Sequence, residues 1–434
     1  MASAKKSSLE GIAPWAEPAW NYLPSPYYNE THKQLRDGLR AYLDENILPY
    51  ALEWEEAGEA PREAAMKWLR SGFGHTDIPS KYRPKDFPLP AGIPLEKLDA
   101  FHLLVSTDET SRVPAGGVMT SMSGANVIGA PPVIHWGTEE QKQKWLPGMF
   151  TWETNFCLGI TEPDAGSDVA QLKTTAEKTP DGKFYIVNGY KKWITGAPYA
   201  THMTTAVRTS GPGMGGLSVL VIPMNSPGLS HRRIPNSGQK AGGASFIELD
   251  NVKVPAENLL GKEGQGFKII MKNFNRERYV MAIGCNRRAR DCMSDAFAYA
   301  HKRHTFGKPL ITNQVIRAKI ARIARDVEAH WAWLETIAYA VNQSPEGWES
   351  QAVAGRLALA KVMGGKLLEK AAREAQQVFG GAGYQRGGVG GNVEQTTRDL
   401  RMMVVGGGSE EILNDLAVRQ EILNATKRGW SPKL

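Results

Sequence analysis

A long apolar stripe in the second half of the chain restricts the fold more than any other feature. Between residues 316 and 341, apolar side chains recur every three or four positions over about seven helical turns. They are Ile316, Ile320, Ile323, Val327, Trp331, Leu334, Ile337 and Val341. Residues 349–379 and 409–424 repeat the helical period. Because long helices with short connections pack as a bundle, the last part of the chain is predicted to be a helical bundle.

Short apolar runs between turn residues mark the middle of the chain. Runs such as 184–187 and 217–222 recur at the spacing typical of a small barrel or sandwich. The residues before them have a helical period, with Leu35, Leu39 and Leu43 four positions apart. The predicted fold is mainly α with a central β domain, and its predicted domains are helical (28–150), β (151–262) and helical again (263–430).

Composition places the chain among ordinary globular proteins. It has 434 residues, of which 41% are hydrophobic and 22% charged. It has no run of 18 apolar residues, so no membrane span is expected. Cys157, Cys285 and Cys292 form no Cys-x-x-Cys pair, so we expect neither a disulfide framework nor a metal site, and we expect a reducing compartment.

The two ends of the chain bear on localisation. The start has lysines but no apolar segment, which argues against secretion. The last residues, Ser431-Pro432-Lys433-Leu434, are a degenerate relative of the Ser-Lys-Leu peroxisomal address. The sequence leaves peroxisome, cytoplasm and mitochondrial matrix open.

The formal charge of +7 raises the question of nucleic acid. Arg287, Arg288 and Arg290 form one basic cluster, for which a solvated helix face is the favoured interpretation. No Lys/Arg run is interleaved with aromatic residues, so no nucleic-acid partner is expected.

Two loop motifs are assigned no chemistry. Residues 211–216 satisfy the Gly-x-Gly-x-x-Gly pattern, which needs a strand before it and a helix after it to bind a dinucleotide. Here a β run follows, so a hairpin turn is predicted. Residues 78–94 contain five prolines and are predicted to be a loop or insertion.

Three further segments are candidates for chemistry. The turn 161–168 follows an apolar run and offers hydroxyls and backbone N–H groups, which suit a flavin edge or a phosphate as well as an ordinary acidic turn. Gly406-Gly407-Gly408 precedes Ser409, a plausible helix N-cap. Glu277 stands on a long predicted helix, where a salt bridge with a neighbouring arginine is the ordinary role of a glutamate.

Taken in order, these motifs resemble the acyl-CoA dehydrogenase family over residues 30–425. The matching segments are 161–168, 192–195, 250–255, 258–261, 303–310 with Gln314, 377–384, and Arg398-Asp399 before the glycine triplet. The resemblance implies an N-terminal helical domain, a small β-barrel and a C-terminal four-helix bundle. It also implies FAD, a homotetramer built from dimers, and removal of two hydrogens across Cα–Cβ of an acyl-CoA or related thioester.

The resemblance assigns residues to the cofactor and to the substrate. Those implied for FAD are Leu158, Ile160, Thr161, Gly166, Ser167, Trp193, Thr195, Arg303, Thr305, Phe306, Gln314, Gln377, Gly380, Gly381, Ser409 and Glu411. Those that would reach the FAD of a neighbouring subunit are Arg303, Thr305, Phe306, Gln314 and residues 377–381. Those implied for the substrate are Ser167, Phe274, Arg278, Gly406 and Gly408.

The resemblance also suggests where the base lies. Many members carry a glutamate at the position of Gly407, whereas an isovaleryl- and long-chain-like minority carry it where Glu277 stands. Glu277 is therefore the predicted base, and the backbone N–H of Gly407 is the predicted donor to the thioester oxygen. Glu410 and Glu411 are rival carboxylates whose placement a helix N-terminus already explains.

Two departures from the family leave the substrate open. A bulky residue is expected before the usual catalytic position, but Gly406 stands there, and the three glycines suggest a branched or bulky acyl group or a substrate that is not a simple acyl-CoA. The proline-rich insertion is expected to cover the pocket or a subunit edge. The electron acceptor is electron-transferring flavoprotein or O₂. With O₂ the chain would be an acyl-CoA oxidase or a nitroalkane-oxidase- or N-hydroxylase-like enzyme. A DNA-binding flavoprotein relative is a further alternative, supported only by the charge of +7.

Overall fold

The computed structural model describes residues 11–431, so the Pro432-Lys433-Leu434 tail on which the peroxisomal expectation rests lies outside the described residues. The chain forms two compact units. The sheet unit comprises residues 49–97 and 116–277, and the bundle unit comprises the described parts of 1–48, 98–115 and 278–434. Within residues 11–431, none of the helices combines the length and the apolar character needed to cross a membrane.

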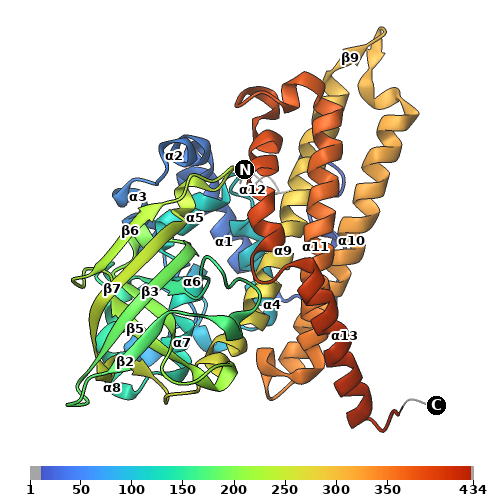
Figure 1. Cartoon of the computed structure of the whole chain (residues 1–434). Coiled ribbons are helices and arrows are strands. Elements are labelled where there is room, and N and C mark those ends of the chain that lie inside the picture. The colour runs from blue at the N-terminus through green and yellow to red at the C-terminus, as the bar shows by residue number, and fades with distance from the viewer. Residues whose placement is uncertain (1–10, 432–434) are drawn as a thin grey trace. The chain divides into compact units, whose positions relative to one another are not determined.

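The sheet unit is built on one eight-stranded sheet (Figure 1). Its strands are β1 (Phe156–Gly159), β2 (Thr175–Lys178), β3 (Phe184–Ile194), β4 (His202–Arg208), β5 (Leu217–Pro223), β6 (Leu229–Arg233), β7 (Ser245–Pro255) and β8 (Leu259–Leu260). Their order is β6-β7-β3-β2-β4-β5-β8, with β1 beside β4. The predicted hairpin at 211–216 does join β4 to β5, which pair antiparallel.

The described sheet is not closed, so the prediction of a small barrel needs correction. One edge is β6, whose sequence Leu-Ser-His-Arg-Arg is almost wholly exposed. The other edge is β8, which has only two residues. A charged edge strand and a very short one are both poor partners for further pairing. Local apolar runs predict the strands but carry no information on whether the two edges meet.

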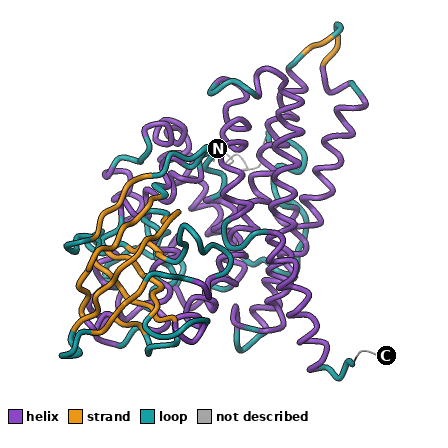
Figure 2. The backbone as a smooth tube through the Cα atoms, viewed as in Figure 1, coloured by secondary structure: helices purple, strands orange, loops and turns teal. Residues whose placement is uncertain are grey.

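Strand β5 is buried on both faces of the sheet. Along β5, Leu217, Val219 and Val221 join one apolar core, whereas Leu220 and Ile222 join another. The helices of this unit are α2 (Ala51–Ala57), α3 (Arg62–Arg70), α5 (Gly116–Ser123), α6 (Asn126–Gly129), α7 (Pro131–Trp136) and α8 (Glu139–Trp145), the purple coils near the orange strands of Figure 2. The proline-rich segment contributes its apolar side chains to the first core, since Ile78 and Tyr82 are buried there.

The structure of the bundle unit confirms the prediction of long helices from the apolar stripe. Its helices are α1 (Glu30–Asn46), α4 (Ala100–Thr110), α9 (Gly266–Lys302, from residue 278 onward), α10 (Gln314–Gln343), α11 (Gln351–Phe379), α12 (Gly391–Val405) and α13 (Glu410–Lys427). From Ile320 to Val341 every stripe residue on α10 is buried. Side chains of α9–α12 share one core, and α13 packs on α11 through Leu413 and Ala417 (Figure 1).

Helices α1 and α4 of this unit both begin with a capping box. Asn29 caps α1 and His32 bonds back to its N–H, and Asp99 with His102 repeats the arrangement at α4. The His32 and His102 rings lie 4.0 Å apart, and His32 Nε2 is 3.1 Å from Asp99 Oδ1. Capping accounts for this His–Asp–His cluster.

The arginine cluster on α9 is buried, so its interpretation as a solvated face was wrong. Arg287 is 1% exposed, and its guanidinium binds both carboxylate oxygens of Asp108 and contacts Glu17 at 3.1 Å. Arg40 also binds Glu17, at 2.8 Å. Burial opposes the charge of Glu17, but Arg287 and Arg40 outweigh it and lower its pKa from 4.5 to about 2. The acids come from distant segments, which the local charge pattern does not reveal.

We expect Arg287→Met to lower the free energy of unfolding by about 3–5 kcal/mol, because Glu17 and Asp108 lose a buried counter-ion. Urea unfolding measures this change. Because folding lowers the Glu17 pKa, its contribution is complete above pH 4.5 and is lost as the pH falls through about 2. Arg419→Met is the matched control, since Arg419 and Asp415 are each 64% exposed and their pair should contribute less than about 1 kcal/mol. If the two substitutions lowered the free energy of unfolding equally, Arg287 would not be a stabilising buried counter-ion of Glu17 and Asp108.

Candidate functional site

A buried ion pair fixes the turn 161–168 in the sheet unit. Lys191 on β3 is fully buried, and its Nζ donates to Glu162 Oε1 at 2.8 Å and to Ile160 O at 3.1 Å. Glu162 also accepts the N–H groups of Lys173 (2.6 Å) and Thr174 (3.0 Å). Burial lowers the pKa of Lys191 to about 8. Burial opposes the charge of Glu162 as well, but Lys191 outweighs it and lowers the pKa of that carboxyl.

The Lys191–Glu162 ion pair lies where the predicted residues at the ends of β1 and β3 come together. The N–H of Lys192 donates to Thr161 O at 2.8 Å, which places the residues after β1 beside those around Trp193. Trp193 is 50% exposed and has a left-handed φ of 65°, which is unusual for an aromatic residue. Gly166 and Ser167 are exposed, and a Cβ on Gly166 would meet nothing within 4 Å. The turn therefore offers an indole, hydroxyls and open backbone on a rigid support.

In the bundle unit, two cations hold the glycine triplet. Lys361 on α11 donates from Nζ to Val404 O and to Gly408 O, the latter at 2.8 Å. Arg278 Nε donates to Gly407 O at 3.2 Å. Gly407 and Gly408 have φ of 68° and 113°. Among the described residues, the N–H of Gly407 has no acceptor, so it is available to a ligand.

The glycines do not leave empty space, which removes the argument for a widened pocket. A Cβ at Gly407 would lie 2.9 Å from Met281 Sδ, and one at Gly406 would lie 3.0 Å from Met281 Cε. A Cβ at Gly408 would lie 2.9 Å from Leu413 Cδ2. Met281 and Leu413 occupy the room that side chains would need. A glutamate at position 407 would require both a left-handed backbone and a displaced methionine.

Glu277 lies at the end of the part of α9 that belongs to the sheet unit. It is half-buried, and its Oε1 accepts a hydrogen bond of 2.5 Å from Asn273 Nδ2 one turn earlier. Phe274, on the same turn, packs against the first core of this unit. Arg276 binds Asp77 at 3.3 Å. Glu277 therefore sits on a rigid, oriented segment.

The rival carboxylates have other surroundings. Glu410 is 3.3 Å from Lys366, and Glu411 is exposed in the first turn of α13. Ser409 occupies the predicted N-cap position, but its side chain makes no capping hydrogen bond. The position was predictable from the sequence, whereas the side-chain geometry was not.

The remaining predicted cofactor residues lie at one end of the bundle, where all but the half-buried Thr305 are exposed. The hairpin of β9 (His304–Thr305) and β10 (Lys308–Pro309) joins α9 to α10 and carries Arg303, Thr305, Phe306 and Gln314 in or beside it. Phe306 is fully exposed. Gln377, Gly380 and Gly381 are also exposed, at the end of α11. Tyr299 stacks on Phe379 with ring centroids 4.5 Å apart, which brings the two motifs to the same end.

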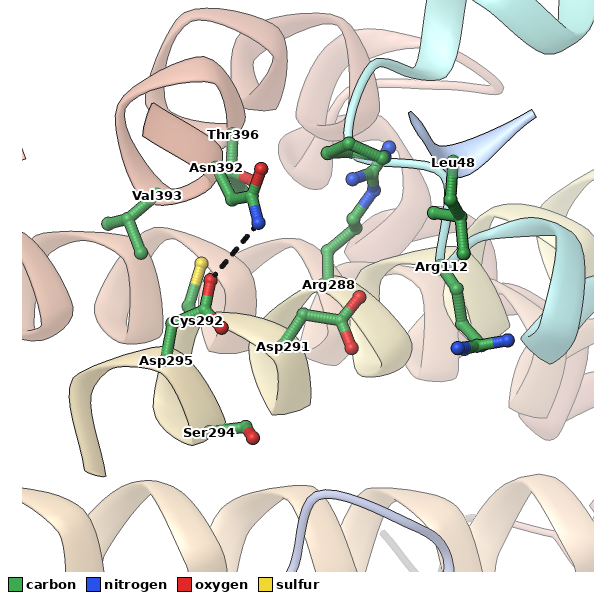
Figure 3. Close-up of a pocket in the computed structure, with 11 residues that line it drawn as sticks. Leu48, Arg112, Arg288, Asp291, Cys292, Ser294, Asp295, Asn392, Val393 and Thr396 are labelled. Atoms are coloured by element: carbon green, nitrogen blue, oxygen red, sulfur yellow. Dashed lines mark hydrogen bonds between the residues drawn. The ribbon is translucent and has the colours of Figure 1, made fainter. Parts of the chain in front are cut away.

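A separate polar cavity of about 170 Å³ lies between α9 and the start of α12 (Figure 3). Its lining residues are Leu48, Arg112, Pro114, Arg288, Asp291, Cys292, Ser294, Asp295, Asn392, Val393 and Thr396. Burial raises the pKa of Asp291 to about 7 and raises that of Asp295. The spacing of the two aspartates, one helical turn apart, was the only sequence signal for this cavity. None of the predicted site residues lines it.

Three family profiles match consecutive parts of the chain. The profile described as the acyl-CoA dehydrogenase N-terminal domain matches residues 29–153, the middle-domain profile matches 157–252, and the C-terminal-domain profile matches 264–422.

Individual proteins match over nearly the whole length. The protein named acyl-CoA dehydrogenase apdG, from Emericella nidulans, is 42% identical over 421 residues, which are 94% of each chain. A solved acyl-CoA dehydrogenase from Geobacillus kaustophilus has a TM-score of 0.82 at 29% identity, covering 92% of this chain and all of that one. Another, from Bacillus anthracis and complexed with FAD, has a TM-score of 0.80 at 25% identity, covering 94% of this chain and 69% of that one.

We expect Glu162→Gln to loosen the turn 161–168, because the amide leaves the Lys191 ammonium buried without a counter-ion. The free energy of unfolding should fall by about 3–5 kcal/mol, and the backbone amides of the turn should exchange faster. Urea unfolding and hydrogen exchange measure the two effects. Asp164→Asn is the control on the same turn, since Asp164 and its partner Lys173 are 71% and 73% exposed. If hydrogen exchange in the turn were unchanged in Glu162→Gln, the ion pair would not be its anchor.

Proposed function

The chain belongs to the acyl-CoA dehydrogenase family, and on that premise we propose that Glu277 is the base that removes the α-proton of its acyl-CoA substrate. The chain is an FAD-dependent oxidoreductase of that family. The observation that carries the proposal is the environment of Gly407. Position 407 carries no side chain, and its left-handed backbone, with φ of 68°, disfavours one, so the carboxylate has to come from elsewhere.

The surroundings of Glu277 suit a general base. A proton α to a thioester is weakly acidic, so the carboxylate has to be oriented toward it and partly shielded from water. Glu277 is half-buried, and Asn273 fixes one of its oxygens. Arg278, the next residue on α9, holds the carbonyl of Gly407. The free N–H of Gly407 is then the donor that stabilises the negative charge on the thioester oxygen.

The turn in the sheet unit fits FAD. An exposed indole beside open backbone and hydroxyl groups is suited to a planar ring and its polar edge. The residues that would hold the cofactor there are Leu158, Ile160, Thr161, Gly166, Ser167, Trp193 and Thr195. Ser409 and Glu411 of the bundle unit are also proposed for FAD, on the family resemblance alone. When bound, FAD supplies the acceptor for the hydride that leaves the β-carbon.

We assign the exposed end of the bundle to a second copy of the chain. Arg303, Thr305, Phe306, Gln314, Gln377, Gly380 and Gly381 would contact the FAD of a neighbouring subunit in a homotetramer. Phe306 is fully exposed, so its ring is accessible for such a contact.

Substrate and acceptor are distinguished by one experiment. Straight, branched and bulky acyl-CoAs are mixed anaerobically with the FAD-loaded protein, and bleaching of the visible flavin band is followed by stopped flow. We expect bleaching with at least one of them, and the one that bleaches most rapidly identifies the acyl class. Admitting air then distinguishes electron-transferring flavoprotein, for which the flavin reoxidises slowly, from O₂, for which it reoxidises rapidly with release of peroxide. Failure of every acyl-CoA would exclude a CoA thioester substrate.

Glu277→Gln should retain FAD and the fold, because glutamine has nearly the same shape. We expect its rate of flavin bleaching to fall by at least about 10²–10⁴-fold, the usual contribution of a general base. Glu410→Gln is the matched control and should bleach at a rate close to that of the unmodified protein. The opposite pattern would identify Glu410 as the base.

A further inference from the structure

We propose that Lys361 is a positioning residue for the glycine turn: its buried ammonium ties the end of α12 to the start of α13, so that the N–H of Gly407 points toward the substrate. The inference rests on the proposed function of Gly407 as the donor to the thioester oxygen. It assigns to Lys361 no contact with substrate or cofactor. Lys361 acts through the backbone that it holds.

The surroundings of Lys361 are unusual for a lysine. It is 1% exposed, and within the described residues no carboxylate lies within 4 Å of its Nζ. Its partners are two backbone carbonyls, those of Val404 and Gly408. A buried cation without a carboxylate partner costs free energy, so stability of the fold alone does not account for a lysine at this position.

The two carbonyls flank the glycine turn. Val404 is in the last turn of α12, where unsatisfied carbonyls carry partial negative charge that a cation stabilises. Gly408 immediately precedes Ser409, the residue at the N-cap position of α13. One ammonium therefore joins the two helices across a segment that has no side chains to pack.

The peptide that carries the Gly407 N–H is anchored on both sides. On the upstream side, the N–H of Gly406 donates to Met402 O at 2.9 Å. On the downstream side, Arg278 holds Gly407 O and Lys361 holds Gly408 O. Glycine backbones are otherwise free to rotate, and peptide units are planar. Fixing the carbonyls on one side and the N–H on the other therefore fixes the direction of the Gly407 N–H.

Several charged or titratable groups face Lys361. Burial lowers the Lys361 pKa to about 8, and the nearby charge of Arg278 acts in the same direction. Glu410 on α13 opposes this change. Burial raises the pKa of Cys285 to about 12 and lowers that of His330, which contacts Ala360 O, to about 4. Both are therefore neutral near pH 8, where Lys361 is the group in this cluster that titrates.

The test compares Lys361→Met with Lys366→Met in the FAD-loaded protein. Lys366 is on the same helix but its side chain is 58% exposed. We expect Lys361→Met to retain FAD and to bleach about 10–10³-fold more slowly at saturating substrate, the scale for a displaced oxyanion donor, with little change in substrate affinity. Lys366→Met should behave like the unmodified protein. A fall in affinity with an unchanged maximal rate would overturn the proposal.

The pH dependence of the bleaching rate also tests whether the Lys361 ammonium holds the glycine turn. In the unmodified protein, the bleaching rate should decrease above about pH 8, because the neutral amine makes weaker hydrogen bonds than the ammonium. This decrease should be smaller in Lys361→Met, where Lys191, whose pKa burial also lowers to about 8, is a remaining buried lysine that titrates in this range. In Lys361→Ala, propylammonium should restore part of the rate, whereas the uncharged propionamide should not. A residue that only stabilises the fold would show neither the pH effect nor the selective rescue, and their absence would overturn the proposal.

Hydrogen exchange distinguishes failure of this inference from failure of the proposed function. Measured without substrate, the hydrogen-bonded amide of Gly406 should exchange at least about tenfold faster in Lys361→Met, since the turn loses its anchor. Unchanged exchange would overturn the role of Lys361. Faster exchange with an unchanged bleaching rate would instead show that the Gly407 N–H is not used, so the donor in the proposed function would be wrong while Lys361 still held the turn.

Discussion

The continuous register of helix α9 determines which groups can act together. From Gly266 to Lys302 the helix has no break, so each residue has a fixed direction relative to its neighbours. Asn273 and Glu277 stand one turn apart and are hydrogen-bonded. Arg278 and Met281 contact the glycine turn. An insertion between Asn273 and Met281 would change the helical register between these side chains, so this stretch of α9 supports the proposed chemistry.

Two turns that carry the proposed chemistry are each held by a buried lysine from a neighbouring element. Lys191 on β3 holds the turn after β1, and Lys361 on α11 holds the turn after α12. In both places the lysine binds backbone carbonyls, and only Lys191 also has a carboxylate partner. Burial lowers both pKa values to about 8. Glycine-containing turns thus keep open backbone for a ligand while their conformation is fixed from behind.

The sequence was sufficient for features that depend on local period and insufficient for those that depend on distant partners. The stripe from Ile320 to Val341 predicted α10, because a buried helix face has the same period wherever the helix packs. The burial of Arg287 depends on Glu17 and Asp108, which are remote in sequence. Likewise, the glycine triplet suggested a wide pocket only because the position of Met281 could not be read from the chain. Edge pairing of the sheet is equally non-local, so its openness was missed.

The contact between Met281 and Gly407 has a consequence for how such a chain can change over evolution. A single replacement of Gly407 by glutamate meets the methionine sulfur and an unfavourable backbone. A single replacement of Met281 by a smaller residue leaves a gap beside the turn. Substitutions at the two positions are therefore expected to be strongly non-additive. Relocating the base from the helix to the turn is therefore expected to depend on positions 281 and 407 together.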